Sequence, residues 1–206
     1  MPASPASPSP ATFRCFGTGD ALYEAYHDTE WGHPVRDDRG LFERVSLEAF
    51  QSGLSWITVL RRRETFRAAF DGFDPEVVAA YGDADVARLL ADPGIIRNRA
   101  KVEATVANAR ALLALQAAGG SLTELFWSAA PDPAPPVPQG PGDVPATTPE
   151  SVALAKSLKA KGFRFVGPTT AYAAMQACGV VDDHLGECPA RAAAERARAA
   201  IEEVHA

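Results

Sequence analysis

Apolar residues along the chain recur mainly at helical spacing. Between about residues 40 and 51, Leu41, Phe42, Val45 and Ala49 form one apolar stripe, since residues three or four apart share a face of an α-helix. The same spacing predicts helices over residues 54–70, 83–91, 98–118 and 168–178. No segment sustains the alternation of β-branched and polar residues that is typical of strands. The pattern predicts an all-α protein.

Proline and glycine mark several helix ends. Asp74-Pro75 and Thr148-Pro149 each place a good N-cap before a proline that needs no hydrogen-bond donor. We therefore expect helices to begin at these pairs, the second of them ending at Gly162. In the stretch 54–70 we expect Arg61, Arg62 and Arg63 to face the solvent.

Composition and charge narrow the class of protein. The chain has 206 residues, 47% hydrophobic and 22% charged, with a net charge of −6. This composition supports a real core and argues against a protein that coats nucleic acid by bulk charge. No apolar run approaches the roughly 18 residues of a membrane span, and the N-terminus lacks the features of a signal peptide. We expect a cytoplasmic protein with no membrane partner.

Cysteine and histidine residues at the two ends of the chain suggest a metal site. An odd number of cysteines without an export signal argues against disulfides. Cys15 and His27 lie near the start, while His184 and Cys188 have the i, i+4 spacing that puts both on one helical face. Together they would form a closed tetrahedral set that suits one structural Zn²⁺ and leaves no open position for a zinc hydrolase. A chance His-x3-Cys pair is the alternative, and Cys178 is expected to be an inert buried thiol.

The domain organisation follows from this metal. Residues 131–147 are rich in proline and glycine and are expected to form an exposed loop; a linker between domains is the alternative. A metal that joins both chain ends favours a single helical domain over 13–188. We expect 1–12 to be a disordered Pro/Ser/Ala tail and 189–206 a helical or frayed tail.

A carboxylate among aromatic residues is the first candidate ligand site. Glu48 falls in line with Leu41 and Val45, where a carboxylate costs free energy unless a cation or hydrogen-bond donor meets it. Tyr26 and Trp56 come from neighbouring aromatic stretches. Ordinary core packing is the alternative, but aromatic faces with one carboxylate suit a flat cationic ligand such as an alkylated purine.

The segment KGFRFVGPTTAYAAM, residues 161–175, is the second candidate site. A turn followed by Gly167, Pro168 and Thr169 at a helix start exposes backbone N–H groups that can hold a phosphate. Residues 151–181 contain no acidic residue. Their four cations are Lys156, Lys159, Lys161 and Arg164. A helix-turn-helix corner with a solvated lysine face is the alternative. A second basic cluster is Arg97, Arg99 and Lys101.

Taken together, these segments resemble the bacterial 3-methyladenine DNA glycosylase I family. The matching stretches run in order over most of residues 14–188 and include LYEAYHDTEWGHPV, LEAFQSGLSWITVL, GIIRNRAKVEATVANA, KGFRFVGPTTAYAAMQACGVVDDH and HLGEC. The family commonly has Trp soon after its first cysteine, whereas this chain has Phe16-Gly17-Thr18 and a spacing to His27 that is shorter by one residue.

The resemblance implies an all-α helix-hairpin-helix DNA glycosylase with one structural zinc per chain, held by Cys15, His27, His184 and Cys188. It also implies a pocket of Tyr26, Glu48 and Trp56 for 3-methyladenine, the product released from alkylated double-stranded DNA.

On this reading, Glu48 is the catalytic carboxylate that reads the cationic base, and no lysine nucleophile is needed. Gly53 and Leu54 would enter the gap left by the flipped base, while Asp182 and Asp183 would orient His184. We expect a monomer. The alternative function is a non-catalytic, zinc-stabilised binder of alkylated DNA.

Overall fold

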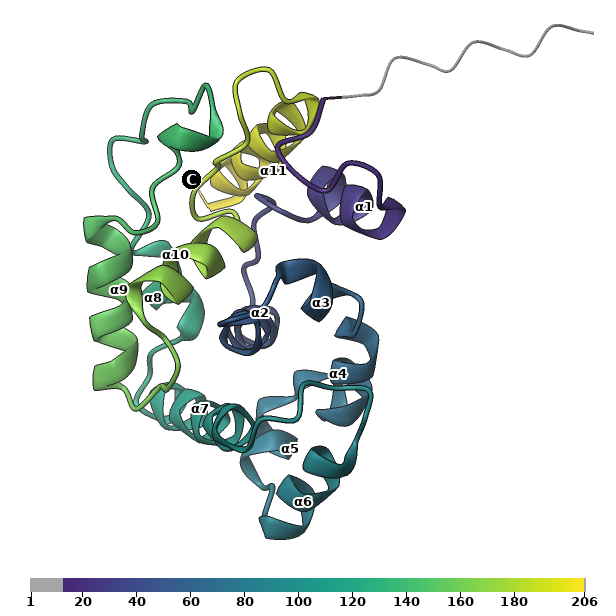
Figure 1. Cartoon of the computed structure of the whole chain (residues 1–206). Helices are drawn as coiled ribbons and strands as arrows, with labels where there is room; N and C mark the ends of the chain where they lie inside the picture. Colours follow the sequence, from purple (N-terminus) through teal and green to yellow (C-terminus); the bar gives the residue numbers. More distant parts are fainter. Residues whose placement is uncertain (1–12, 206) are drawn as a thin grey trace, which may run out of the picture.

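The computed structural model describes the backbone of residues 13–205 and the side chains of residues 13–200. The tail predicted for residues 1–12 lies outside the described part. Within the described residues there is no strand, so the all-α prediction is confirmed. Figure 1 shows the helices arranged around one central helix. In chain order they are α1 (Ala21–Thr29), α2 (Asp38–Gln51), α3 (Trp56–Leu60), α4 (Arg63–Ala69), η1 (Asp71–Phe73), α5 (Pro75–Ala79), α6 (Asp83–Ala91), α7 (Arg99–Ala117), α8 (Leu122–Trp127), η2 (Pro141–Asp143), α9 (Pro149–Ala160), α10 (Pro168–Ala177) and α11 (Pro189–His205).

The central helix is α2, which packs against α3, α7, α8 and α10 (Figure 1). Its predicted apolar stripe is buried, as are the other large apolar residues of the helix, and Leu41, Phe42, Leu47 and Phe50 are at 0% exposure. Burial of each large apolar side chain stabilises the folded state by about 1.5–3 kcal/mol. Glu48 therefore projects from the most tightly packed element of the fold.

The predicted caps form as expected. The Asp74 side chain accepts a hydrogen bond from the Glu76 N–H at the start of α5. The Thr148 side chain accepts from the Ser151 N–H, and the Ser151 hydroxyl in turn accepts from the Thr148 N–H at the start of α9. Local sequence thus determines where these helices begin.

The single helix predicted over residues 54–70 is wrong. The chain breaks into α3 and α4 at Arg61 and Arg62. The break turns Arg63 inward, where its guanidinium donates to both carboxylate oxygens of Glu30 at 2.6 and 2.8 Å. The Arg63 side chain is therefore mostly buried in an ion pair and does not face the solvent. Its orientation is set by Glu30, 33 positions away, and not by the local helical periodicity.

The proline-rich segment 131–147 is mostly exposed and has no regular structure beyond η2. It is anchored where the Gly186 N–H donates to the Pro138 carbonyl at 2.9 Å. Pro141 at the start of η2 and Val144 just after it line a cavity together with residues of α1 and α10. This segment therefore forms one wall of a cavity, which a purely exposed loop would not do.

The two ends of the described chain meet, since α1 packs against α11 (Figure 1). None of the described helices has the length and apolarity that a membrane crossing requires.

Candidate functional site

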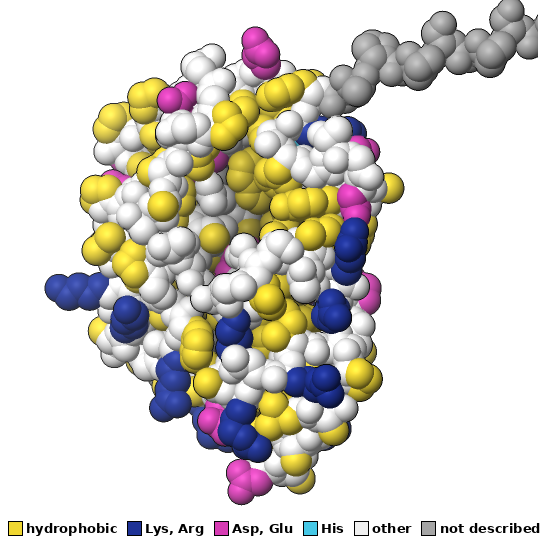
Figure 2. All heavy atoms as spheres, in the orientation of Figure 1, with side chains coloured by type: hydrophobic (Ala, Val, Ile, Leu, Met, Phe, Trp, Pro, Cys, Tyr) yellow, Lys and Arg dark blue, Asp and Glu magenta, His cyan; other side chains and the backbone are white. Residues whose placement is uncertain are grey.

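A cavity of about 340 Å³ opens between α1, α2, α3, α10 and the proline-rich segment. Figure 2 shows hydrophobic side chains gathered in a hollow on this face of the molecule. Aromatic rings make up much of the wall, and polar groups are few. The lining residues used below are Phe16, Tyr23, Tyr26, Trp31, Glu48, Trp56, Val144, Gln176 and Asp183.

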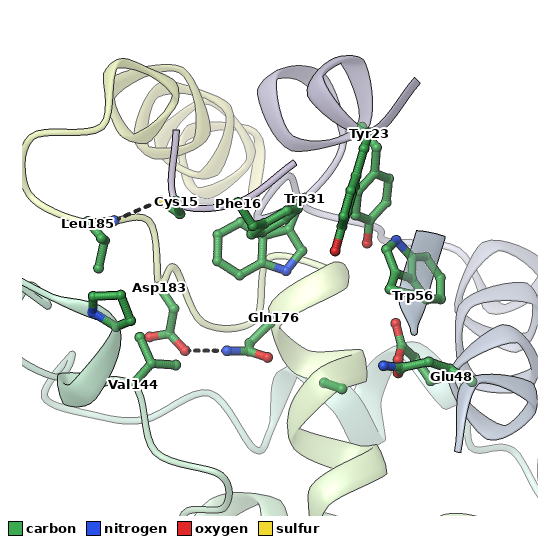
Figure 3. A pocket seen from close by; sticks show the side chains of 14 residues that line it. Cys15, Phe16, Tyr23, Trp31, Glu48, Trp56, Val144, Gln176, Asp183 and Leu185 are labelled. Carbon is green, nitrogen blue, oxygen red and sulfur yellow. Dashed lines mark hydrogen bonds between the residues drawn. The ribbon is translucent and has the colours of Figure 1, made fainter. Parts of the chain in front are cut away.

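Glu48 is a buried acid that lines this cavity (Figure 3). It is only 5% exposed, and no hydrogen bond or ion pair reaches its carboxylate from the described residues. Burial raises the pKa of Glu48 to about 8, against the opposing attraction of Arg44. A carboxylate without a protein donor in an apolar cavity is suited to a ligand that brings a positive charge or hydrogen-bond donors.

Two aromatic residues predicted to bind a base lie next to Glu48. The Tyr26 and Trp56 rings have centroids 5.3 Å apart at a tilt of 44°. Both are buried, at 2% and 9% exposure. The indole Nε1 of Trp56 is buried and has no hydrogen-bond partner in the described part of the chain. The fold thus brings all three predicted base-binding residues to one cavity.

Phe16 follows Cys15 in the segment where the resembled family commonly has tryptophan, and its ring forms part of the cavity wall. Its ring packs edge-on to Trp31 at 4.9 Å and tilted against Tyr23 at 5.0 Å. It also meets the His27 ring edge-on at 4.9 Å. Phe16 therefore lies between the cavity and His27, one of the predicted metal ligands.

The C-terminus of α2 is held by a buried lysine. The Nζ of Lys101 donates to the carbonyl oxygens of Phe50 at 2.9 Å and Ser52 at 2.7 Å. Lys101 is 7% exposed, so it does not share an exposed basic cluster with Arg97 and Arg99 as predicted. The reason is that the last carbonyls of a helix have no intrahelical donor and attract a cation.

The break after α2 exposes the predicted wedge. Gly53 has φ +83°, a conformation that favours glycine. Leu54 follows it with 43% of its side chain exposed. The arrangement leaves an apolar side chain in solvent beside the helices that line the cavity.

Cys15, His27 and Cys188 form a compact group whose ligand atoms lie within 4.8 Å of one another. The Cys188 sulfur lies 3.6 Å from the Nε2 of His27. Two sulfurs and an imidazole nitrogen are a donor set typical of structural Zn²⁺. Residues 15, 27 and 188 therefore fit a metal that joins the two ends of the chain.

His184, the fourth predicted ligand, lies beside this group. Its ring is edge-on to that of His27, with centroids 5.0 Å apart. Its Nε2 lies 3.4 Å from the His27 carbonyl oxygen. A side chain on Gly32, whose φ is +80°, would come within 2.8 Å of the His184 ring, so only glycine fits there.

Carboxylates orient both imidazoles. The Nδ1 of His27 lies 2.8 Å from Asp28, and the Nδ1 of His184 lies 2.8 Å from Asp182. Each ring thus keeps Nε2 for another partner, the arrangement found around metal-binding histidines.

The second aspartate of the pair differs from expectation. Asp183 accepts hydrogen bonds from the Tyr172 hydroxyl at 2.6 Å and the Gln176 amide at 2.8 Å, instead of contacting His184. Because consecutive residues here point in different directions, Asp183 lines the cavity, with Gln176 beside it (Figure 3).

The predicted DNA face is the turn between α9 and α10, residues 161–167, which we call the hairpin. Lys161, Arg164 and Thr169 are exposed, and no side chain caps Gly167 at the start of α10. In Figure 2, Lys and Arg side chains gather on the half of this face that holds α7 and the hairpin. Arg97 and Arg99 are exposed at the start of α7.

Sequence reasoning missed the residues that reach the cavity from the proline-rich segment and α10. Pro141 and Val144 gave no signal, since a proline-rich stretch indicates only extended backbone. Gln176 was hidden in an apolar helix, although a lone amide there could have been noted.

Comparisons with known proteins agree with this geometry. The sequence profile of the methyladenine glycosylase family matches residues 16–192. DNA-3-methyladenine glycosylase 1 of Escherichia coli is 49% identical over 171 residues, covering 82% of this chain and 91% of that protein. A crystal structure of 3-methyladenine DNA glycosylase I superposes with a TM-score of 0.83 at 49% identity, covering 86% and 98% of the two chains.

A solved structure of the Staphylococcus aureus 3-methyladenine DNA glycosylase I, which concerns its recognition of 3-methyladenine, has a TM-score of 0.82 at 37% identity. It covers 86% of this chain and 95% of its own. A match over most of the sequence, high identity and the same helical fold lead to one conclusion: the chain belongs to the methyladenine glycosylase family.

Proposed function

We propose that this DNA-3-methyladenine glycosylase takes an extruded N3-methylated adenine into the cavity and reads it with Glu48, Tyr26 and Trp56. The observation that carries the proposal is the buried Glu48 carboxylate, which has no hydrogen-bond donor among the described residues. A cationic base supplies both the charge and the N–H groups that this carboxylate lacks. The Tyr26 and Trp56 rings supply apolar and cation–π contact with its faces.

The chemistry follows from the charge of the base. When the bond between N9 and the sugar carbon breaks, its electron pair neutralises the purine, which leaves as 3-methyladenine. Water then adds to the sugar carbon and loses a proton to solvent. The residues that line the cavity include no lysine, so they provide no amine for a covalent sugar adduct. The protein thus binds, orients and releases the base without cutting the strand.

The hairpin supports the DNA part of this proposal. Exposed Lys161 and Arg164 provide charge for phosphates, and the uncapped N–H groups at Gly167 and Thr169 provide donors, as in a helix-hairpin-helix element. Leu54 would fill the gap that the extruded nucleotide leaves, with Gly53 as the turn that presents it.

We also propose one structural Zn²⁺ held by Cys15, His27, His184 and Cys188. The convergent sulfurs, the His27 Nε2 and the two oriented imidazoles support this set. Such an ion would join the two ends of the chain and add its binding free energy to folding. The expectation of a monomer stays a prediction.

Release of the base from methylated duplex DNA tests the function and separates it from the alternative, a binder that recognises without excising. Glu48→Gln keeps the size of the side chain and removes its charge. We expect it to slow excision by about 30- to 150-fold, which corresponds to about 2–3 kcal/mol for a charge-assisted contact. If the folded variant excises 3-methyladenine at the rate of the unmodified protein, Glu48 does not read the base.

A further inference from the structure

Arg44 is a buried cation one helical turn before Glu48 on α2. Its side chain is 12% exposed, and its Nη2 donates to Glu30 Oε2 at 2.9 Å. Glu30 is gripped from its other side by Arg63 at 2.6 and 2.8 Å. The two arginines hold the pKa of Glu30 at about 2, despite its burial. The position of the Arg44 guanidinium is thus determined by a fully charged partner.

The other terminal nitrogen of Arg44, Nη1, is buried and has no hydrogen-bond partner. No acceptor among the described residues receives its N–H groups. The guanidinium carbon lies 5.9 Å from the centre of the Tyr26 ring. This ring is one wall of the cavity that holds Glu48. A desolvated cation with a spare donor therefore lies next to the base-reading group.

The other titratable groups that act on Glu48 carry no charge at neutral pH. They are Tyr23 and Tyr26 of α1 and Cys178 at the end of α10. Burial raises the pKa of both phenols above their ordinary value and that of the Cys178 thiol to about 12. The charge of Arg44 opposes the effect of burial on Glu48 and lowers its pKa.

We propose that Arg44 is a positioning residue that acts through Glu48. Held in place by Glu30, the Arg44 guanidinium offsets the free-energy cost of a buried charge on the Glu48 carboxylate, so that Glu48 can ionise when a cationic base binds. This proposal rests on the base-reading role proposed above for Glu48. It explains how a carboxylate can be kept in an aromatic cavity without a direct donor and still ionise when a cation arrives.

The two partners of the Arg44–Glu30 pair then have opposite effects on Glu48. Arg44→Met removes the cation, so Glu48 ionises only at higher pH. Glu30→Gln removes the anion that partly neutralises Arg44, so Glu48 ionises at lower pH. A structural role for the pair predicts instead that both variants unfold more easily and leave the Glu48 titration where it is.

The experiment follows the carboxyl carbon of Glu48 by ¹³C NMR between about pH 4 and pH 10, with the signal assigned by its absence in Glu48→Gln. We expect Arg44→Met to move the titration midpoint upward by about one pH unit or more. Arg44→Lys should restore much of the shift, and Glu30→Gln should move it downward. The acid limb of kcat/KM for N3-methyladenine release, corrected for spontaneous loss, should move in the same directions.

Midpoints that coincide in all three variants and the unmodified protein would overturn the proposal. If Arg44→Met does not fold, the downward shift in Glu30→Gln decides alone, and an upward or absent shift there is contrary evidence. A failure of this kind is distinct from a failure of the proposed function. In the second case Glu48→Gln itself would excise at the unmodified rate.

Discussion

Asn108 on α7 holds the backbone of Arg164 in the hairpin through two hydrogen bonds. Its Nδ2 donates to the Arg164 carbonyl oxygen at 3.1 Å, and the Arg164 N–H donates to its Oδ1 at 2.7 Å. The two residues are 56 positions apart, and Asn108 is only 1% exposed. The amide satisfies both backbone groups of a residue that lies outside any helix, so the hairpin has one fixed position on α7.

Asn108→Ala should therefore loosen the hairpin. We expect a loss of about 1–3 kcal/mol in the free energy of unfolding, because two backbone groups lose their partner. Binding of alkylated DNA should weaken, while binding of free 3-methyladenine to the cavity should stay the same. Denaturant unfolding and two titrations measure these effects. Equal losses for DNA and free base would show that Asn108 supports the whole fold rather than the hairpin.

Charge reversal in the hairpin tests the DNA face. Lys161→Glu and Arg164→Glu should each weaken binding about equally for all sequences, because phosphate contacts do not read bases. The slope of log K against log salt should fall by about one or more for each variant. The matched control is Arg196→Glu, an exposed cation of α11 at the opposite end of the molecule from α7. If the control and the hairpin variants bind alike at several salt concentrations, the hairpin is not the contact surface.

Leu54→Ala tests the wedge after α2. The variant should excise more slowly from duplex DNA, where the gap must be filled, and at the unmodified rate from single-stranded DNA. Leu22→Ala is the control, since Leu22 is an equally exposed leucine, at 44% compared with 43%. Equal rates for Leu54→Ala and Leu22→Ala on the duplex would remove Leu54 from the mechanism.

Cys188→Ser tests the metal. The variant should contain less than one zinc per chain and melt at a lower temperature, because metal binding is linked to folding. Cys178→Ala is the matched control, as Cys178 is fully buried and outside the ligand group. Elemental analysis measures the zinc content, and calorimetry measures the melting temperature. Full zinc content with unchanged melting in Cys188→Ser would contradict the assignment.

The raised pKa of Glu48 also predicts how stability depends on pH. In the unfolded chain the carboxyl ionises near its ordinary value of 4.5, whereas in the folded protein its pKa is about 8. Between these values the unfolded state has lost the proton and the folded state keeps it, so the contribution of Glu48 to stability falls as pH rises. Glu48→Gln should thus gain stability relative to the unmodified protein as pH rises from 5 to about 8. Denaturant unfolding at several pH values measures the difference in the free energy of unfolding between the variant and the unmodified protein. If this difference does not change with pH, Glu48 is not buried as a neutral acid.

The helical class, the caps at Asp74 and Thr148 and the start of α7 at Asn98 were predictable from sequence, because each depends on contacts within a few residues. Glu48 could also be singled out from the sequence, since a carboxylate in an apolar stripe stands out against its neighbours, and the structure places it in one cavity with Tyr26 and Trp56. Periodicity alone misplaced the stretch 54–70, since it contains no information about Glu30.

Only the tertiary structure decided which polar groups meet. It placed Lys101 on the end of α2 rather than in an exposed basic cluster, and it directed Asp182 to His184 but Asp183 to Tyr172. It also made a cavity wall of a proline-rich segment that sequence shows only as irregular. The physical reason is the same in each case: a buried charge or backbone carbonyl must find a partner, and partners from distant segments become available only when the helices pack.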